Sequence, residues 1–332
     1  MIPYLEQPSW RLGPVTVHAF GVIVAVAVLT GLVLGGRRFR QLGLDARVGD
    51  GLAGYVVVCG FLAAHLFSVL FYFPHEVVEN PLVLLKVWED ISSFGGILGG
   101  IGGAWLYFRI KAPSIDRALR WVYVDVVAYV FPVSLAIGRI ACSVAHDHPG
   151  TLTTLPLAVS LESGAARAYI DGVYRAAGRF AELPPTAVLA RLGFHDLGWY
   201  EFVYLSLLVM PVTLALGRKS RTPGAFFMSF IALYMPVRFT LDSLRVSDVR
   251  YAGLTPAQWV ALLLLAALPV LWIGRRRMTV AGTPLSRYEP FPPRLTGWNR
   301  DIGPTGRAPE SAFNRFRSRG SQRARSEGDG LK

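Results

Sequence analysis

The sequence predicts an all-α polytopic membrane protein with seven transmembrane helices and a small periplasmic cap. Only 17% of its 332 residues are charged, against roughly 25% in an average soluble domain. Two apolar runs, 15–36 and 251–274, contain no Lys, Arg, Asp or Glu. Each run is long enough to cross a membrane, because a helix needs about 20 residues to span the hydrocarbon core. A soluble globular protein is therefore excluded.

Seven apolar segments are expected to form the spans. They cover residues 15–36, 51–73, 91–108, 121–138, 202–217, 222–237 and 251–274. The fifth and sixth have few residues between charges, so flanking residues must complete them. The third is rich in glycine at four-residue spacing, which allows two helices to approach closely in lipid. We expect helix packing there, with a glycine-walled passage beside a site as the alternative. No basic stretch precedes the first run, so no cleaved signal peptide is expected.

The distribution of basic residues predicts the orientation. Cytoplasmic loops of membrane proteins are enriched in Lys and Arg. Fourteen of them follow spans one, three, five and seven. By contrast, the loop between spans two and three, FPHEVVENPLVLLKVWED, has one Lys and four acids. The N-terminus is therefore expected in the periplasm and the C-terminus in the cytoplasm.

Residues 1–277 are expected to form one transmembrane domain, in which 139–201 include the external cap loop. Residues 278–332 form a basic tail with little apolar surface, and we expect it to be disordered. Anionic membrane lipid is its expected partner. Nucleic acid is not expected, with RNA as the weaker alternative, because no folded nucleic-acid-binding module accompanies the tail.

Charged residues gather near the predicted external ends of the spans. Arg238, Asp242 and Arg245 are spaced so that they share one face of a helix. A ladder of salt bridges is one interpretation. An anion site is the other, because the guanidinium fork binds phosphate through two parallel hydrogen bonds.

His146, Asp147 and His148 are consecutive. Two histidines in this pattern can bind a metal, but no third ligand is evident apart from His195, so we expect no metal. A general-base role for Asp147 or a neighbouring histidine is the preferred interpretation. The sequence has no GxSxG, GxxxxGK[ST] or HExxH motif, and no cofactor is expected.

Six fragments occur in order between residues 15 and 277. They are HAFG (18–21), the stretch from His65 to LFYF (70–73), SSFGGILGG (92–100), GRIACSVAHDHPG (138–150), FHDLGWYE (194–201), and Tyr234 with RFTLDSLR (238–245). Together they resemble the motifs of bacterial prolipoprotein diacylglyceryl transferases. Residues 151–193 and the tail are not covered by the resemblance.

The resemblance implies a function. The family transfers a diacylglyceryl group from phosphatidylglycerol to the lipobox cysteine thiol of prolipoproteins, the first step of bacterial lipoprotein maturation, at the inner (plasma) membrane. The implied partners are phosphatidylglycerol, the signal-peptide and lipobox region of a prolipoprotein, and membrane lipids. The residues expected in catalysis are Asp147, His146, His148, Arg238 and Asp242. Those expected in substrate binding are Arg139, Arg245, Tyr234, His195, Glu201 and His65.

The sequence also departs from the family pattern. The histidine of the family's SFHGG motif falls at Phe94, and its signature asparagines fall at Cys142 and Ala145. The tyrosine of the first span falls at Phe20, and the arginine of the second at His65. These changes leave two alternatives open: an inactive or re-purposed lipid-binding relative, and an outer-leaflet lipid transferase with another acceptor.

Overall fold

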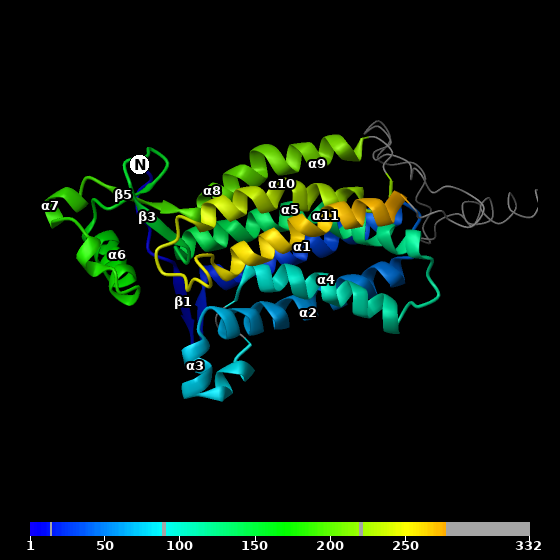
Figure 1. The fold of residues 1–332 in the computed structure, drawn as a ribbon, viewed down its shortest axis with the longest axis horizontal. Coiled ribbons are helices and arrows are strands. Elements are labelled where there is room, and N and C mark those ends of the chain that lie inside the picture. Colours follow the sequence, from blue (N-terminus) through cyan, green and yellow to red (C-terminus); the bar gives the residue numbers. More distant parts are fainter. Residues whose placement is uncertain (14, 88–90, 219–221, 277–332) are drawn as a thin grey trace, which may run out of the picture.

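A computed structural model describes residues 1–13, 15–87, 91–218 and 222–276. Long helices run side by side along the longest axis of the molecule (Figure 1). The predicted tail, 278–332, lies outside the described residues, so its predicted disorder and lipid binding stay predictions.

A helix forms in each of the seven predicted segments. The helices are α1 (Ala19–Gln41), α2 (Ala46–Phe71), α4 (Ser93–Ile110), α5 (Arg117–Ala145), α8 (Leu197–Tyr204) continued by η3 (Leu205–Val209) and α9 (Met210–Gly217), α10 (Ala225–Asp242) and α11 (Pro256–Arg276). Six of these stretches, all except the 18-residue α4, are long and apolar enough to cross a membrane. The chain is thus a mostly helical, multi-pass membrane protein, as predicted.

Several helix ends differ from the prediction. The first span begins only at Ala19, because β1 (Ser9–Leu12) and β2 (Val15–His18) form an antiparallel hairpin before it. Conversely, α5, α8 and α10 extend past the predicted limits of 138, 202 and 237. Charged residues were expected to end these helices. They do not, because the charges pair with one another inside the protein instead of facing lipid.

The long loop after α5 folds into a mixed cap, so the structure is not entirely α-helical. Its elements are β3 (Pro149–Thr153), β4 (Val159–Ser160), α6 (Gly164–Ala176), η2 (Phe180–Glu182), α7 (Thr186–Leu189) and β5 (Gly193–Asp196). The three strands form a sheet in the order β3-β5-β4. Ile2 joins this cap through hydrogen bonds with Ala158 and Ser160. The N-terminus therefore lies on the cap side, as Figure 1 shows.

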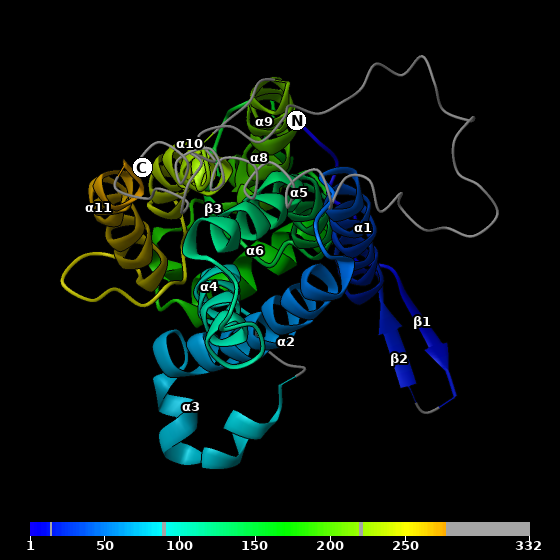
Figure 2. The ribbon, with the colours of Figure 1, turned by 90° about the vertical axis from the view of Figure 1, so that its right-hand side faces the viewer.

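The ends of the bundle differ in composition. The cap, the β1–β2 hairpin and α3 (Pro74–Glu79), which leads into η1 (Pro81–Leu85), lie at one end (Figures 1 and 2). The connections from α1 to α2 and from α4 to α5, and the end of α11, lie at the other. The loops rich in Lys and Arg thus share one end of the molecule, which is the arrangement that the charge pattern predicted.

Asp125, an acid inside the fourth span, has a structural partner. Its carboxylate accepts hydrogen bonds from the backbone N–H groups of Gly224, at 2.7 Å, and Phe227, at 3.0 Å. These groups begin α10 and have no acceptor within their own helix. Asp125 on α5 therefore caps α10 and ties the two helices together.

Glycines allow α4 to pack directly on the backbone of α2. A Cβ atom added at Gly99 would lie 2.4 Å from the Cys59 carbonyl oxygen, and one at Gly95 would lie 2.5 Å from that of Ala63. Such contacts are much closer than van der Waals distance. The packing interpretation of this segment is thus confirmed, since only residues without a Cβ permit so close an approach.

We expect Gly99→Ala to destabilise the protein by about 1–3 kcal/mol, as overpacking of a tight interface usually does. The matched control is Gly102→Ala on the same helix, where an added Cβ meets nothing within 4 Å. The measurement is the thermal unfolding midpoint of the purified protein in detergent. Equal midpoints for the two variants would show that the contact between α2 and α4 leaves room for a methyl group at residue 99.

Candidate functional site

Two buried arginines share one buried glutamate between the helices. Nε of Arg139 on α5 lies 2.9 Å from Oε2 of Glu201 on α8. Nη1 of Arg238 on α10 donates to Oε1 of the same carboxylate at 2.6 Å. All three side chains are at most 2% exposed. Three helices distant in sequence thus converge on one carboxylate.

Hydroxyl groups complete the surroundings of Arg139. Its Nη2 donates to Ser93 Oγ at 2.9 Å and to the Tyr234 hydroxyl at 3.2 Å. The Tyr234 hydroxyl in turn donates to Glu201. Phe94 is buried, and its ring lies 5.6 Å from the guanidinium carbon of Arg238. The side chain at the position of the family's histidine therefore packs against a site arginine.

A second carboxylate continues this ion network outward. Nη2 of Arg238 lies 3.1 Å from Oδ1 of Asp242, one turn later on α10. Arg245 reaches the same oxygen at 3.6 Å and Asp248 at 2.9 Å. Thr255, just before α11, donates to the other oxygen of Asp242. The predicted salt-bridge ladder is present, and it leads directly into the arginine pair.

Two arginine donors in this network are buried and not used by the described residues. Nε of Arg238 and Nε of Arg245 are buried and have no hydrogen-bond partner within the described residues. Burial raises the pKa of Asp248, although the nearby Arg245 lowers it in part. A buried N–H without an acceptor is costly. An oxyanion entering here would be stabilised by donors that are already oriented.

A second cluster lies where α5 ends. His146 has a left-handed backbone (φ 51°), and the N–H groups of His146 and Asp147 donate back to the carbonyls of Ser143 and Cys142. This Schellman turn folds Asp147 and His148 over Cys142. The donor atoms of Cys142, Asp147 and His148 lie within 4.8 Å of one another. The cluster adjoins the arginine pair, because Arg139 Nη1 donates to Cys142 Sγ at 3.5 Å.

Charge holds Asp147 in its ionised form. Desolvation raises the pKa of its carboxyl group. His148, and further away Arg139, lower it more, so the pKa lies below the ordinary value for aspartate. Asp147 is therefore a carboxylate at neutral pH.

Three of the predicted histidines lie outside these clusters. His146 points into the cap, where Nδ1 contacts Asp196 at 2.8 Å, Nε2 contacts the Leu5 carbonyl at 3.2 Å, and the ring stacks on Tyr4. His195 contacts the Tyr200 hydroxyl at 3.0 Å, and partial burial lowers its pKa. His65 Nε2 donates to the carbonyl of Val83 and so ties α2 to η1.

Ser93, Thr255 and Asp248 were not predicted from the sequence to belong to the site, and Cys142 was noted there only as a departure from a motif. Ser93 lies within the resemblance fragment SSFGGILGG (92–100), directly before Phe94, and this position was the one available signal for it. Thr255 and Asp248 lie in the connection to α11 and have no motif. Thr255 contacts Asp242, which lies 13 positions earlier in the sequence. Asp248 pairs with Arg245 three positions earlier, in a segment where no motif pointed to it.

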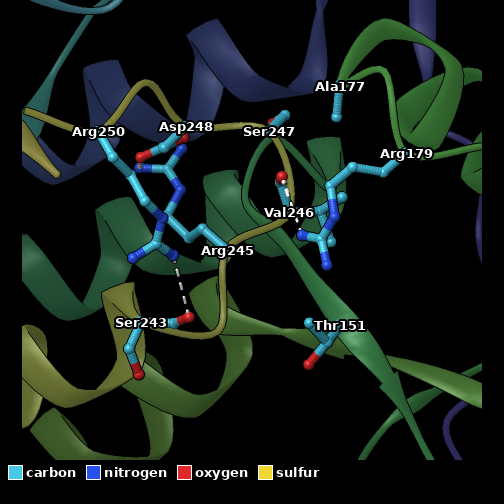
Figure 3. Close-up of a pocket in the computed structure, with 9 residues that line it drawn as sticks. All are labelled: Thr151, Ala177, Arg179, Ser243, Arg245, Val246, Ser247, Asp248 and Arg250. Atoms are coloured by element: carbon cyan, nitrogen blue, oxygen red, sulfur yellow. Dashed lines mark hydrogen bonds and ion pairs between the residues drawn. The ribbon is translucent and has the colours of Figure 1, made fainter. Parts of the chain in front are cut away.

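A polar pocket of about 490 Å³ opens beside Arg245. It is lined by Thr151, Ala177, Arg179, Ser243, Arg245, Val246, Ser247, Asp248 and Arg250. Figure 3 shows Arg179, from the cap, on one side and Arg245 and Arg250, from the segment after α10, on the other. The lining contains three guanidinium groups and one carboxylate, so its net charge is positive.

Comparisons with known proteins identify a family and several relatives of this chain. Residues 7–274 match the profile of the family described as "Prolipoprotein diacylglyceryl transferase". Two similar proteins are both named phosphatidylglycerol–prolipoprotein diacylglyceryl transferase. The protein from Methylibium petroleiphilum is 29% identical over 289 residues, which cover 82% of this chain and 98% of the relative. The protein from Symbiobacterium thermophilum is 26% identical over 280 residues, which cover 83% and 96%.

Proposed function

The chain belongs to the prolipoprotein diacylglyceryl transferase family, and from this premise we propose that it transfers a diacylglyceryl group from phosphatidylglycerol to the lipobox cysteine thiol of a prolipoprotein. Glycerol 1-phosphate is the leaving group. One observation carries the proposal: Arg139 and Arg238, both buried, converge on Glu201 at the cap end of the helices. This is where a phospholipid headgroup in the outer leaflet would lie.

The arginines recognise and stabilise the phosphate. Negative charge develops on the phosphate as its bond to the glyceryl carbon breaks, and fixed cations lower the energy of that state most. Arg238 and Arg245 offer unpartnered Nε–H donors to this charge. Arg139 is held in place by Ser93 and Tyr234. The positive pocket beside Arg245 has room for the water-soluble product to leave.

Asp147 and His148 activate the acceptor thiol. A free cysteine has a pKa of about 8.5, and only its thiolate is a strong nucleophile. Asp147 and His148 lie beside Cys142, which contacts Arg139. The acceptor sulfur would thus be activated next to the cation that binds the phosphate. His146 is better placed as a structural residue of the cap, and His195 and His65 as supports of nearby loops.

The proposed location is the bacterial inner membrane, with residues 1–277 as the transmembrane domain, the cap in the periplasm and the basic end in the cytoplasm. This orientation follows from the Lys and Arg loops at one end of the bundle. A reporter fused within 151–193 should be active only as a periplasmic reporter, and one fused after Arg277 only as a cytoplasmic reporter. The opposite result at both points would reverse the orientation.

The activity is tested by rescue of a bacterial strain depleted of its own transferase, together with mass-shift detection of a diacylglyceryl-modified lipobox peptide in membranes. Rescue and modification are expected. A second candidate, a lipid-binding relative without transfer activity, is favoured by Phe94, because it replaces the family's histidine and packs on Arg238. Binding of phosphatidylglycerol without rescue or modification would select this second function.

A further inference from the structure

We propose that two arms at the cap end of the bundle bind lipid and lie at the boundary between the headgroups and the acyl chains of the adjacent leaflet. One arm is the β1–β2 hairpin, and the other consists of α3 and η1. Both arms expose apolar side chains outside the membrane-spanning helices. Lipid contact by these arms is independent of the transfer reaction.

The α3–η1 arm presents large apolar side chains outward. Val78 is 85% exposed, Leu82 66% and Leu85 71%. Val83 is buried instead, and its carbonyl accepts a hydrogen bond from Nε2 of His65 on α2 at 3.1 Å. One side of the arm is thus fixed to the bundle, while the other side offers an apolar surface.

The composition of the α3–η1 arm favours an apolar partner. Burying one Val or Leu side chain stabilises by about 1.5–3 kcal/mol, and contiguous exposed apolar side chains usually mark a binding surface. Residues 74–85 include the acids Glu76 and Glu79 but no Lys or Arg. Charge therefore gives this arm no attraction to anionic headgroups, so the apolar side chains must supply the binding energy.

The apolar surface of this arm follows directly on that of a membrane span. Leu62, Leu66 and Leu70 are exposed on α2, and their four-residue spacing places them on one side of the helix. α2 ends at Phe71, and α3 begins at Pro74. The lipid that covers this side of α2 therefore reaches the arm without a long aqueous connection.

Both arms project sideways from the bundle near the level where the spans end. In Figure 1, β1 and α3 lie beside the cap-side ends of the helices, whereas α6 and α7 of the cap lie farther out along the long axis. Figure 2, which looks along that axis, shows the hairpin and α3 extending outward from the helices. Because the spanning helices run along this axis, the arms extend across the membrane normal, at the depth of the leaflet surface.

The hairpin places apolar and polar residues on opposite faces. Trp10 pairs with Val17 across the two strands, so their side chains share one face, and Arg11 pairs with Thr16 on the other. Trp10 is 52% exposed, although a two-stranded hairpin by itself is only marginally stable in water. Tryptophan is enriched at membrane interfaces, where its ring meets apolar chains and its N–H group meets water or headgroups.

The headgroup–acyl boundary is the partner that fits both arms. Amphipathic segments at this boundary bury their apolar side by about 5–10 Å. Two such contacts, one before α1 and one after α2, would also limit the tilt of the bundle, since interfacial anchors help to set helix tilt.

The test measures the surroundings of a fluorophore on one cysteine of the full chain, in vesicles of phosphatidylethanolamine and phosphatidylglycerol. Cys59 and Cys142 are the two native cysteines and are replaced with serine. The labelled variants are Leu82→Cys and Trp10→Cys. We expect blue-shifted emission, strong quenching by lipid with a nitroxide near the headgroup, and weak quenching by aqueous iodide. The quenching of the Leu82→Cys label should not depend on the fraction of phosphatidylglycerol.

The matched control is Val188→Cys on α7 of the cap, because Val188 is 49% exposed but lies outside both arms. Its label should be quenched by iodide and not by nitroxide lipid. Leu207→Cys, in η3 of the fifth span, should respond to a nitroxide deep in the acyl chains. If the serine chain does not fold, each label is measured in the parent chain, with the signal of the native cysteines subtracted.

Two outcomes would overturn the proposal. Iodide quenching at Leu82→Cys and Trp10→Cys equal to that at Val188→Cys would place both arms in water. Protection of these labels from iodide and from nitroxide lipid alike would mean that protein, such as a second copy of the chain, covers the arms instead of lipid.

Discussion

Replacing Arg238 with lysine is expected to reduce kcat/KM for diacylglyceryl transfer by about 10²–10³, and replacing it with alanine by at least as much. Loss of one well-placed electrostatic donor typically has this effect. Lysine keeps the charge but not the planar fork, which here contacts Glu201 at 2.6 Å and Asp242 at 3.1 Å. The measurement is the rate of lipobox-peptide modification in membranes, normalised to the amount of folded protein.

Arg167→Lys is the matched control for this prediction. Arg167 donates to the carbonyls of Leu161 and Glu162 in the cap and is not part of the arginine pair. Its replacement should change the rate by no more than roughly twofold, as for most substitutions outside a site. If Arg238→Lys and Arg238→Ala both transfer at the wild-type rate, the ion pairs of Arg238 are structural only, and the catalytic assignment is wrong.

Replacing Glu201 with glutamine is expected to have the largest effect on stability. Glu201 is fully buried, and it is the carboxylate that Arg139 and Arg238 share. Removing one partner of a buried ion pair usually costs about 3–5 kcal/mol, because the remaining charge stays buried without compensation. Here two arginines would lose their common partner. We therefore expect a lower unfolding midpoint in detergent and loss of transfer.

Glu182→Gln provides the comparison. Glu182 also forms an ion pair with an arginine, Arg179, at 2.7 Å, but this pair is exposed to solvent in the cap. Water screens such a pair, so little or no change in the unfolding midpoint is expected. Equal midpoints for Glu201→Gln and the wild-type protein would mean that the arginine pair does not depend on Glu201 for its stability.

Much of the membrane architecture follows from local sequence. An uncharged run such as 251–274 cannot remain in water, and lipid permits it only as a helix, since every backbone group must be hydrogen-bonded internally. The clustering of Lys and Arg in alternate loops likewise follows from composition, and the structure places those loops at one end. The helical spacing of Arg238 and Asp242 was sufficient to predict their contact, because i and i+4 share a face.

Helix ends were less predictable, for an electrostatic reason. A charge near the end of an apolar run normally marks the water boundary, and Arg139 and Glu201 were placed outside the spans for that reason. Both lie within helices and are buried, because each compensates the charge of the other at 2.9 Å. This pairing joins residues 62 positions apart in the sequence. No local pattern contains that information.

The sequence by itself determined the class of the protein: a multi-pass helical membrane protein with order and motifs similar to one transferase family. Only the tertiary structure decided which polar residues meet. It separated His146, whose left-handed backbone turns its ring into the cap, from His148, which the same turn folds onto Cys142. His146 and His148, although close in sequence, therefore lie in different surroundings. The physical reason is that composition and periodicity act locally, whereas charge compensation and hydrogen bonding between distant residues depend on distances that only the packed helices set.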